Sequence, residues 1–485
     1  MSKRTEPDET LYGTSLSLLT DLYQLTMGYG YWRQGMHDRA SVFHLFFRRC
    51  PFGGRYAIAA GLMPALQWLA EFQVTSSDVD YLRTLLGNDS KRLFDDEFLR
   101  VLKGMRLSLD VDAIPEGTVV FPHQPLVRVS GPLWQCQWVE TALLNIINFQ
   151  TLIATKAARV CQAAGGDAVL EFGLRRAQGI DGGLAASRAA YIGGCHATSN
   201  VLAGKLHGIP VRGTHAHSWV MSFDTEPEAF DAYAKAMPNN CVFLVDTYDT
   251  LAGVTNAIEV GRQLRARGHQ MVGIRLDSGD LGQLSRQARQ MLDDAGFSDA
   301  SIVASNDLDE SSIAELKSQG ACIAIWGVGT NLVTAKGNPA LGGVYKLGAI
   351  RNNDGDWEPR IKLSEQAIKR SVPGIQQVRR WTHDGKLVGD VLFSQLIGPP
   401  DGLSGHRVES PDQSLEIASV GESSDLLQPV MRSGQVVPPH QSLQQIRQFA
   451  LSQLAQLPAG VLSGDLAYPV VLEERLSQQR EALSQ

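Results

Sequence analysis

The chain has 485 residues, of which 44% are hydrophobic and 20% are charged, and its formal net charge is −7. This is the composition of an ordinary globular protein, and the length exceeds what one hydrophobic core holds, so we expect two or three domains. The negative charge argues against nucleic acid as a partner, whereas local basic residues can still bind a small anion. The start, MSKRTEPDET, has no apolar signal-peptide segment, and no stretch reaches the ~18 apolar residues of a membrane-spanning helix.

The cysteines are scattered and include no C-x-x-C pair. This spacing fits reduced thiols better than disulfides or a structural zinc site, so it predicts a cytoplasmic protein. The six positions are Cys50, Cys136, Cys161, Cys195, Cys241 and Cys322.

The N-terminal third mixes helices with short strands. Residues 18–32 have the spacing of an amphipathic helix, with Thr20 as its N-cap. We expect a strand over 41–49, a mostly buried helix over 56–72, and short strands between turns over 107–131. A long helix is predicted to follow, up to residue 164.

From about residue 166, short apolar runs alternate with helical segments. This rhythm, roughly 30 residues per unit, is the βα pattern of a parallel sheet or barrel. Helical segments such as 249–268 and 280–296 end at glycine, as helices often do. Six strands are predicted, fewer than the eight of a complete barrel: 168–172, 209–213, 241–246, 270–276, 301–305 and 322–327.

The chain returns to hairpin-like strands at Gly342, and helices follow from about residue 430 with Leu443, Ile446, Ala450 and Leu454 at core spacing. We therefore expect an α/β domain from residues 1–150, completed by about 342–430. Residues 151–341 would form the α/β barrel with the active site, and 431–485 a C-terminal helical segment.

Polar side chains follow each apolar run of the barrel segment, where α/β barrels gather catalytic groups. A single polar residue there is most often a helix N-cap, but six successive runs with three arginines exceed what capping explains. The planar guanidinium groups of arginine bind phosphate or carboxylate. The segment WGVGTN resembles the glycine turns that bind phosphate. The segment RLDSGD supplies acidic side chains that could bind ribose hydroxyls or Mg²⁺.

The segment VRGTHAHSWV carries two histidines, His215 and His217, on one face of an extended segment. A metal-dependent hydrolase would use both as ligands, but His269, a possible further ligand, precedes its strand and so lies at the wrong end. A buried core histidine is the alternative for His215, and less so for His217.

Seven segments between Leu18 and Thr334, taken in order, closely resemble nicotinate phosphoribosyltransferase. They are LLTDLYQLTMGYGYW, LFFRRCPFGGRYAIAAGL, EFGLRRAQGIDGG, SNVLAGKLHGIPVRGTHAHSWV, LVDTYDTL, IRLDSGDL and GVGTNLVT. The resemblance implies transfer of phosphoribose from 5-phosphoribosyl 1-pyrophosphate (PRPP) to nicotinate, with Mg²⁺, and ATP hydrolysis coupled through a phosphohistidine at His217. It also implies an irregular TIM-like α/β barrel beside an α/β domain built from both chain ends, in a homodimer with shared active sites.

Site residues are carried over from the resemblance position by position. For nicotinate, the resemblance implies stacking by Phe172 and by Tyr23 of a second subunit, and carboxylate binding by Arg275 with Thr214 beside it. For PRPP it implies Asp277, Asn306, Gly327, Gly329, Thr330, Arg175, Arg48 and Arg49.

Two features bear on rival interpretations. Nicotinamide phosphoribosyltransferases of this fold carry an acid in the stretch that corresponds to ATSNV, and this chain has none there, which favours nicotinate. A ligand sensor on the same barrel would lose the histidine or the arginines, and both are present. The segment Cys195-His196-Ala197 departs from the family pattern.

Overall fold

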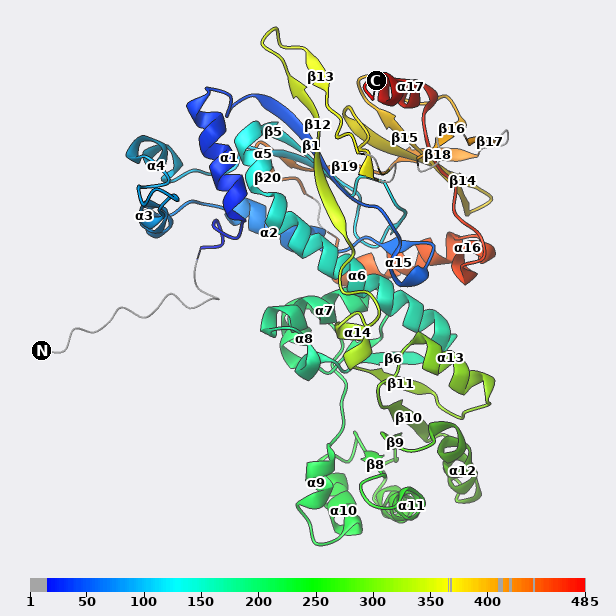
Figure 1. Cartoon of the computed structure of the whole chain (residues 1–485). Coiled ribbons are helices and arrows are strands. Elements are labelled where there is room, and N and C mark those ends of the chain that lie inside the picture. The colour runs from blue at the N-terminus through cyan, green and yellow to red at the C-terminus, as the bar shows by residue number, and fades with distance from the viewer. Residues whose placement is uncertain are drawn as a thin grey trace, which may run out of the picture. The chain divides into compact units, whose positions relative to one another are not determined.

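The structure, a computed structural model, describes residues 15–484 except 365, 367–368, 409–412, 418–420 and 439–440 (Figure 1). It divides into two compact units. The first comprises residues 1–149, 341–441 and 452–485, and the second comprises 150–340 and 442–451. The segment 431–485, expected to form a C-terminal helical segment, is divided between the units and also contributes strands.

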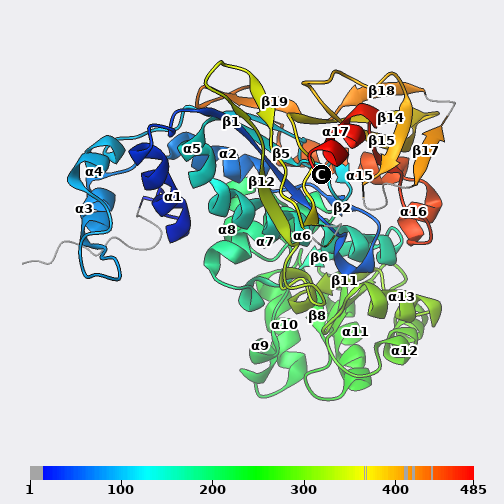
Figure 2. The ribbon, with the colours of Figure 1, turned by 45° about the horizontal axis from the view of Figure 1, so that its top comes forward.

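The first unit contains a seven-stranded sheet that joins both ends of the chain. β1 is almost completely buried, with only Ala40 partly exposed. It pairs antiparallel with β5 on one side and with β12 on the other, and β12 is more than 290 residues away from β1 in sequence. Figure 1 and Figure 2 both show β12 alongside β1. The order is β13 (Trp357–Pro359), β12 (Gly343–Arg351), β1 (Ala40–Phe47), β5 (Val127–Pro132), β3 (Asp110–Ala113), β19 (Gln428–Arg432) and β20 (Gln435–Val436).

Two more sheets belong to this unit. A two-stranded sheet pairs β2 (Ala57–Ile58) with β4 (Val119–Val120). A six-stranded sheet runs β17 (Ser414–Ile417), β16 (Leu403–Arg407), β21 (Val470–Leu472), β15 (Lys386–Ser394), β14 (Gln376–His383) and β18 (Glu422–Asp425). Trp381, Val391, Leu403 and Val471 form a hydrophobic cluster in the latter.

Helices of the first unit differ from the sequence predictions at two starts. Thr20 is not an N-cap, because its hydroxyl donates to the Trp138 carbonyl and α1 begins after Asp21. The helix predicted from residue 56 begins at Leu62, after β2 and the left-handed Gly61. The helices are α1 (Leu22–Arg33), η1 (Pro51–Gly53), α2 (Leu62–Glu71), α3 (Ser76–Thr84), α4 (Asp96–Leu102), α5 (Leu133–Trp138), α16 (Ala459–Ser463) and α17 (Glu474–Ala482). Two further helices, α6 (Glu140–Ala164) and α15 (Leu443–Gln456), contribute residues to both units.

The second unit is built on a six-stranded sheet in which every pair is parallel. Its order is β7 (Ala197–Thr198), β6 (Ala168–Glu171), β11 (Ile325–Val328), β10 (Ser301–Ser305), β9 (Gly273–Leu276) and β8 (Val242–Leu244). Its helices are η2 (Leu174–Arg176), α7 (Ile180–Ile192), α8 (Val201–His207), α9 (His217–Met221), α10 (Glu226–Ala236), α11 (Thr250–Ala266), α12 (Leu281–Asp294), α13 (Glu310–Ser318) and α14 (Thr330–Val333).

The mixed α/β class is confirmed, and five of the six predicted strands of this unit are present. The strand predicted over 209–213 is wrong, because that segment makes a single parallel bridge, Thr198 to Val211. Ala197 and Thr198, outside any long apolar run, form the sixth strand instead. Within the described part of the chain, no helix is long and apolar enough to cross a membrane.

A buried ion pair fixes the sheet of β14 and β15. Asp390 is fully buried and accepts from Arg380 at 2.9 and 2.6 Å, from the Tyr468 hydroxyl at 3.0 Å and from the Gln124 amide at 2.6 Å. Removing one partner of such a pair leaves an uncompensated buried charge.

Asp390→Asn should therefore destabilise the first unit by about 3–5 kcal/mol, because Arg380 stays charged and buried. Asp425→Asn, which breaks the half-exposed pair with Arg379, should cost less than about 1 kcal/mol. Denaturant unfolding followed by circular dichroism measures both variants. An equal loss of stability in the two variants would contradict this account.

Candidate functional site

The carboxyl ends of adjacent strands in the second unit surround a cavity of about 200 Å³. Because β6, β11, β10 and β9 are neighbours and parallel, the residues at their ends meet at one edge of the sheet. The lining residues are Phe172, Arg175, Arg176, Arg275, Asp277, Ser305, Asn306, Asp307, Gly327, Gly329 and Thr330. Eight of them are site residues that the sequence predicted.

Arg275 and Asp277 are locked together at the end of β9. The Arg275 Nη2 donates to Asp277 Oδ1 at 2.8 Å, and its Nε donates to the Ser305 hydroxyl at 2.8 Å. Ser305 in turn donates to Asp277 Oδ1. The Arg275 guanidinium carbon lies 5.8 Å from the centre of the Phe172 ring. A cation and an aromatic face are therefore presented together at the cavity wall.

The Asp277 carboxyl is held ionised. Burial raises its pKa, but the hydrogen bond from Ser305 and the charge of Arg275 outweigh this effect, and the pKa lies below its usual value. Its backbone N–H donates to Asp246 Oδ2 at 2.7 Å, as does the Ser278 hydroxyl. The other oxygen of Asp246, Oδ1, is buried and has no hydrogen-bond partner among the described residues.

Glycines let the turns after β6 and β11 approach each other. A Cβ on Gly327 would lie 2.8 Å from the Phe172 ring, and one on Gly329 would lie 3.2 Å from the Phe172 carbonyl oxygen. A larger residue at either position would push on Phe172. These contacts explain the Gly-x-Gly spacing, and they bring Thr330, the first residue of α14, to the cavity.

The turn after β10 adopts a strained backbone. Asn306 and Asp307, neither of them glycine, have positive φ angles of 121° and 39°. The buried Asn331 holds this turn, because its side-chain amide donates to the carbonyls of Asp307 and of Leu308. Asn331 thus connects the turn after β10 to the glycine turn after β11.

His217 begins α9 next to the cavity. Its Nε2 lies 3.6 Å from Asp277 Oδ2, its Nδ1 lies 3.1 Å from the Thr247 hydroxyl, and 39% of its side chain is exposed. This imidazole is therefore open to solvent while it is oriented by two polar neighbours, as a reactive side chain must be.

His215 is in the opposite environment. Its side chain is buried, its Nε2 accepts the Leu244 backbone N–H at 3.3 Å, and its ring contacts Tyr233 at a centroid distance of 4.9 Å. Burial lowers the pKa of His215 to about 4. It is a neutral core histidine near neutral pH, and the two members of the pair have different roles.

Besides His217, four predicted site residues are not among the residues that line this cavity. Thr214 is not among the lining residues, and its hydroxyl donates to the Val242 carbonyl. Tyr23, Arg48 and Arg49 belong to the first unit, where Tyr23 is exposed on α1 and the two arginines line a separate cavity. Partial burial of the phenol and the neighbouring Glu140 carboxylate raise the pKa of Tyr23.

The unusual segment Cys195-His196-Ala197 lies behind the site rather than in it. His196 Nδ1 accepts the Val169 N–H at 3.2 Å, and Cys195 is buried. None of the three lines the cavity. The nearby Glu171 carboxylate is buried and accepts hydrogen bonds from the Thr198 and Ser187 hydroxyls, at 2.6 and 2.8 Å, and from the Gly173 N–H. These bonds hold the residues on both sides of Phe172 in place.

Sequence reasoning did not single out Ser305, Asp246 or Asn331. Ser305 ends an apolar run, Asp246 ends another, and Asn331 follows Thr330 in the glycine turn. For Ser305 and Asp246, the position at a strand end was the available signal, and for Asn331 it was the glycine turn. Their bonding partners, however, are far away in sequence.

Asn331→Asp should weaken binding of PRPP, the substrate that the sequence resemblance implies, by about tenfold. The variant has the same shape but loses both donors and sets a carboxylate against two carbonyls, so the turn at 306–308 is released. Titration calorimetry measures this change, and Asn239→Asp, at an exposed position of the same unit, is the control. Unchanged affinity in Asn331→Asp would show that the turn does not need this anchor.

Comparisons with known proteins agree with one another. The models of the nicotinate phosphoribosyltransferase (NAPRTase) N-terminal domain and of the nicotinate phosphoribosyltransferase C-terminal domain match residues 18–148 and 376–480. Nicotinate phosphoribosyltransferase of Bacillus subtilis (strain 168) is 50% identical over 367 residues, covering 76% of this chain and 73% of that protein. The Homo sapiens protein of that name is 38% identical over 532 residues, covering 97% of each.

A solved structure matches as well. The crystal structure of human nicotinic acid phosphoribosyltransferase has a TM-score of 0.83 and 34% identity, covering 96% of this chain and 99% of that one. Such identity across nearly the whole of both chains exceeds what a shared fold alone requires. The chain therefore belongs to the nicotinate phosphoribosyltransferase family.

Proposed function

We propose that the chain transfers phosphoribose from PRPP to nicotinate, giving nicotinate mononucleotide and pyrophosphate, with ATP hydrolysis coupled through a phosphohistidine at His217. The observation that carries the proposal is the Arg275–Asp277–His217 cluster. It combines a guanidinium, an ionised carboxylate and a partly exposed imidazole beside one cavity.

Nicotinate would lie against Phe172 with its carboxylate on Arg275. The hydrogen bonds to Ser305 and Asp277 use Nε and Nη2, which leaves the Nη1 side of the guanidinium for a ligand. A charge-assisted contact of this kind selects a carboxylate over a neutral amide. The nicotinamide alternative is not favoured, because no acid follows Thr198, whose hydroxyl is already bonded to Glu171.

PRPP would occupy the rest of the cavity. Asp277 and Asn306 would bind the ribose hydroxyls, and the turn from Gly327 to Thr330 would bind the 5′-phosphate. Arg175, with Arg176 beside it, would bind the pyrophosphate. Arg48 and Arg49, which the sequence resemblance also assigns to PRPP, belong to the first unit. The pyridine nitrogen attacks the anomeric carbon while the bond to pyrophosphate breaks, so the protein's task is to position both reactants and to stabilise the developing charges.

The residues of this site fit a magnesium ion that is bound mainly by oxygen atoms of the substrate rather than by a full set of protein ligands. No group of three or more His, Cys, Asp or Glu side chains among the described residues is arranged to hold a metal. The unpartnered Oδ1 of Asp246 offers one carboxylate oxygen, and Mg²⁺ commonly takes one or two carboxylates besides phosphates and water. When bound, the ion neutralises charge on the pyrophosphate. The metal-dependent hydrolase is disfavoured, since the buried Nε2 of His215 is occupied by a backbone N–H.

In the ATP-coupled half of the reaction, a nitrogen of His217 attacks the γ-phosphorus of ATP and ADP departs. Water later cleaves the phosphohistidine to inorganic phosphate. The hydrogen-bonding distance to Thr247 and the proximity of Asp277 would orient the ring for this attack. The phosphoryl group would then lie beside the groups that bind the substrates.

Two structural inferences accompany this function. We infer that the parallel sheet of the second unit is part of an irregular barrel with its active site at the carboxyl ends of the strands. We also infer a homodimer with shared sites, because exposed apolar side chains mark interfaces. They cluster around the start of α1 (Leu16, Leu19, Leu22, Tyr23) and on α8 (Val201, Leu202, Leu206).

His217→Asn should abolish acid-labile, base-stable labelling by γ-labelled ATP and the stimulation of nicotinate mononucleotide formation by ATP. Slow ATP-independent transfer should remain, because the nicotinate and ribose contacts are intact. His215→Gln, which keeps a neutral acceptor for the Leu244 N–H, is the matched control and should still be labelled. If His217→Asn is still labelled and His215→Gln is not, the acceptor is the other histidine of the pair.

Mixing Tyr23→Ala chains with His217→Ala chains tests the shared site. Each variant alone should be nearly inactive. In a mixed dimer, one site receives an intact Tyr23 and an intact His217, so activity should reappear after subunit exchange. Exchange demonstrated by mass spectrometry without recovered activity would contradict a shared site.

A further inference from the structure

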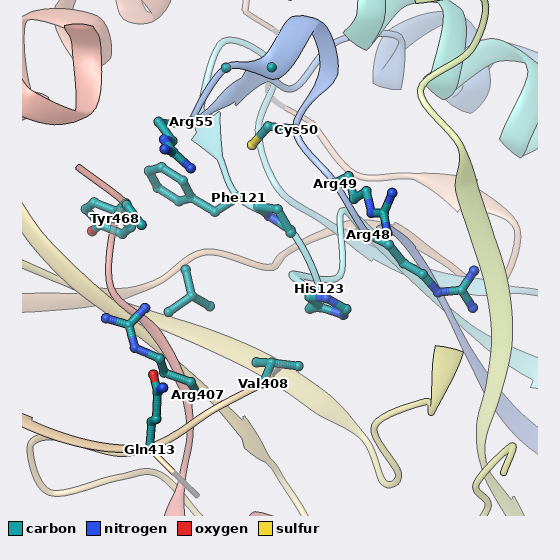
Figure 3. A pocket seen from close by; sticks show the side chains of 15 residues that line it. Arg48, Arg49, Cys50, Arg55, Phe121, His123, Arg407, Val408, Gln413 and Tyr468 are labelled. Carbon is teal, nitrogen blue, oxygen red and sulfur yellow. The ribbon is translucent and has the colours of Figure 1, made fainter. Parts of the chain in front are cut away.

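The first unit has its own cavity, of about 440 Å³, lined by four separate segments of the chain (Figure 3). They are the loop after β1, the turn at 121–123, the end of β16 with Gln413, and the segment leading into β21. Among the residues that the structure describes, four arginines and one histidine line it, and none of these lining residues is acidic. Such a concentration of positive charge, in a chain of net charge −7, points to an anionic ligand.

The floor of the cavity is rigid. The rings of Phe121 and Tyr468 stack 3.9 Å apart with an interplanar angle of 7°, and both are almost fully buried. The Tyr468 hydroxyl is bonded to Asp390, and the Arg380 guanidinium lies 5.6 Å from the Phe121 ring. Because the two rings cover each other, they offer little face on which a nucleobase could stack. The cavity is suited to recognise charge rather than an aromatic base.

The wall formed by residues 121–124 is also held in place. Gln124 accepts the Phe121 N–H at 3.0 Å and donates to Asp390 at 2.6 Å. His123, which is not glycine, has a φ of 68°, and its N–H donates to the Phe47 carbonyl at 2.7 Å. A non-glycine residue keeps such a backbone only where its surroundings fix it, so this wall is formed before any ligand arrives.

The arginines fall into two groups. Figure 3 shows Arg55 and Arg407 on opposite sides of Tyr468, whereas Arg48 and Arg49 extend away from them. Arg55 is anchored by a 2.7 Å hydrogen bond from its Nε to the Gly464 carbonyl. That bond leaves its two terminal nitrogens, in the fork geometry that suits phosphate oxygens, to face the cavity.

We propose that this cavity is a second anion site, which binds a polyphosphate group between Arg55 and Arg407. Neither Arg55 nor Arg407 has a role in the proposed catalysis. Arg48 and Arg49, which the sequence resemblance assigns to PRPP, line the same cavity but extend away from these two arginines. A pyrophosphate or triphosphate carries several negative charges in a volume that this cavity accommodates, and its oxygens match two guanidinium forks. The group can belong to free pyrophosphate or to a nucleoside triphosphate, since only the phosphate oxygens contact the two arginines.

The test is titration calorimetry of the full-length chain with inorganic pyrophosphate in buffer of physiological ionic strength. The wild type should show two binding events per chain, and Arg55→Gln/Arg407→Gln should lose one of them, with affinity reduced at least tenfold. Arg100→Gln, an exposed arginine of the same unit, is the control and should keep both. Equal binding by the wild type and the double variant would overturn the proposal.

Two further measurements separate the alternatives. Tripolyphosphate and ATP should bind this site equally, and a clear preference for ATP would contradict recognition of the phosphates alone. Formation of nicotinate mononucleotide by Arg55→Gln/Arg407→Gln should keep its kcat and its KM for PRPP. If that KM rises in step with the loss of pyrophosphate binding, the cavity belongs to the substrate site and the second-site proposal fails. Thermal unfolding of the double variant, with a Tm like that of the wild type, confirms that it is folded.

Discussion

The carboxylate of Asp277 is the point on which the second unit's site depends. It receives the Arg275 guanidinium and the Ser305 hydroxyl on one oxygen, and its other oxygen lies 3.6 Å from His217. Its backbone N–H is held by Asp246 from the neighbouring strand. Three adjacent strands and α9 therefore converge on one negative charge. If that charge were lost, Arg275 would lose its restraint and His217 its ionic neighbour at the same time.

This convergence is a consequence of parallel pairing. Antiparallel neighbours would send alternate strand ends to opposite edges, whereas here β8, β9, β10, β11 and β6 all end at the same edge. The strand ends also carry the local strain, in the positive φ angles of Asn306 and Asp307. The buried Asn331 restrains this turn through the backbone carbonyls, and the buried Glu171 at the end of β6 accepts from the Thr198 hydroxyl of β7.

Sequence periodicity predicted the βα alternation, because strands are local features, and the family resemblance supplied eight of the cavity residues. Periodicity failed where tertiary contacts decide. Thr20 has the right position for an N-cap, but the Trp138 carbonyl, more than 100 residues away, takes its hydroxyl. The apolar run at 209–213 reads as a strand, yet the two-residue strand at Ala197 pairs with β6 instead.

The histidine pair shows why residue type and spacing alone do not determine chemistry. Two imidazoles separated by one alanine differ because α9 begins at the second of them. The first stays in the extended segment, where Phe230, Tyr233 and the β8 backbone surround it and suppress its protonation. The second turns out of that layer to the edge where the strands end. The start of this five-residue helix is thus enough to separate a buried structural imidazole from a partly exposed one.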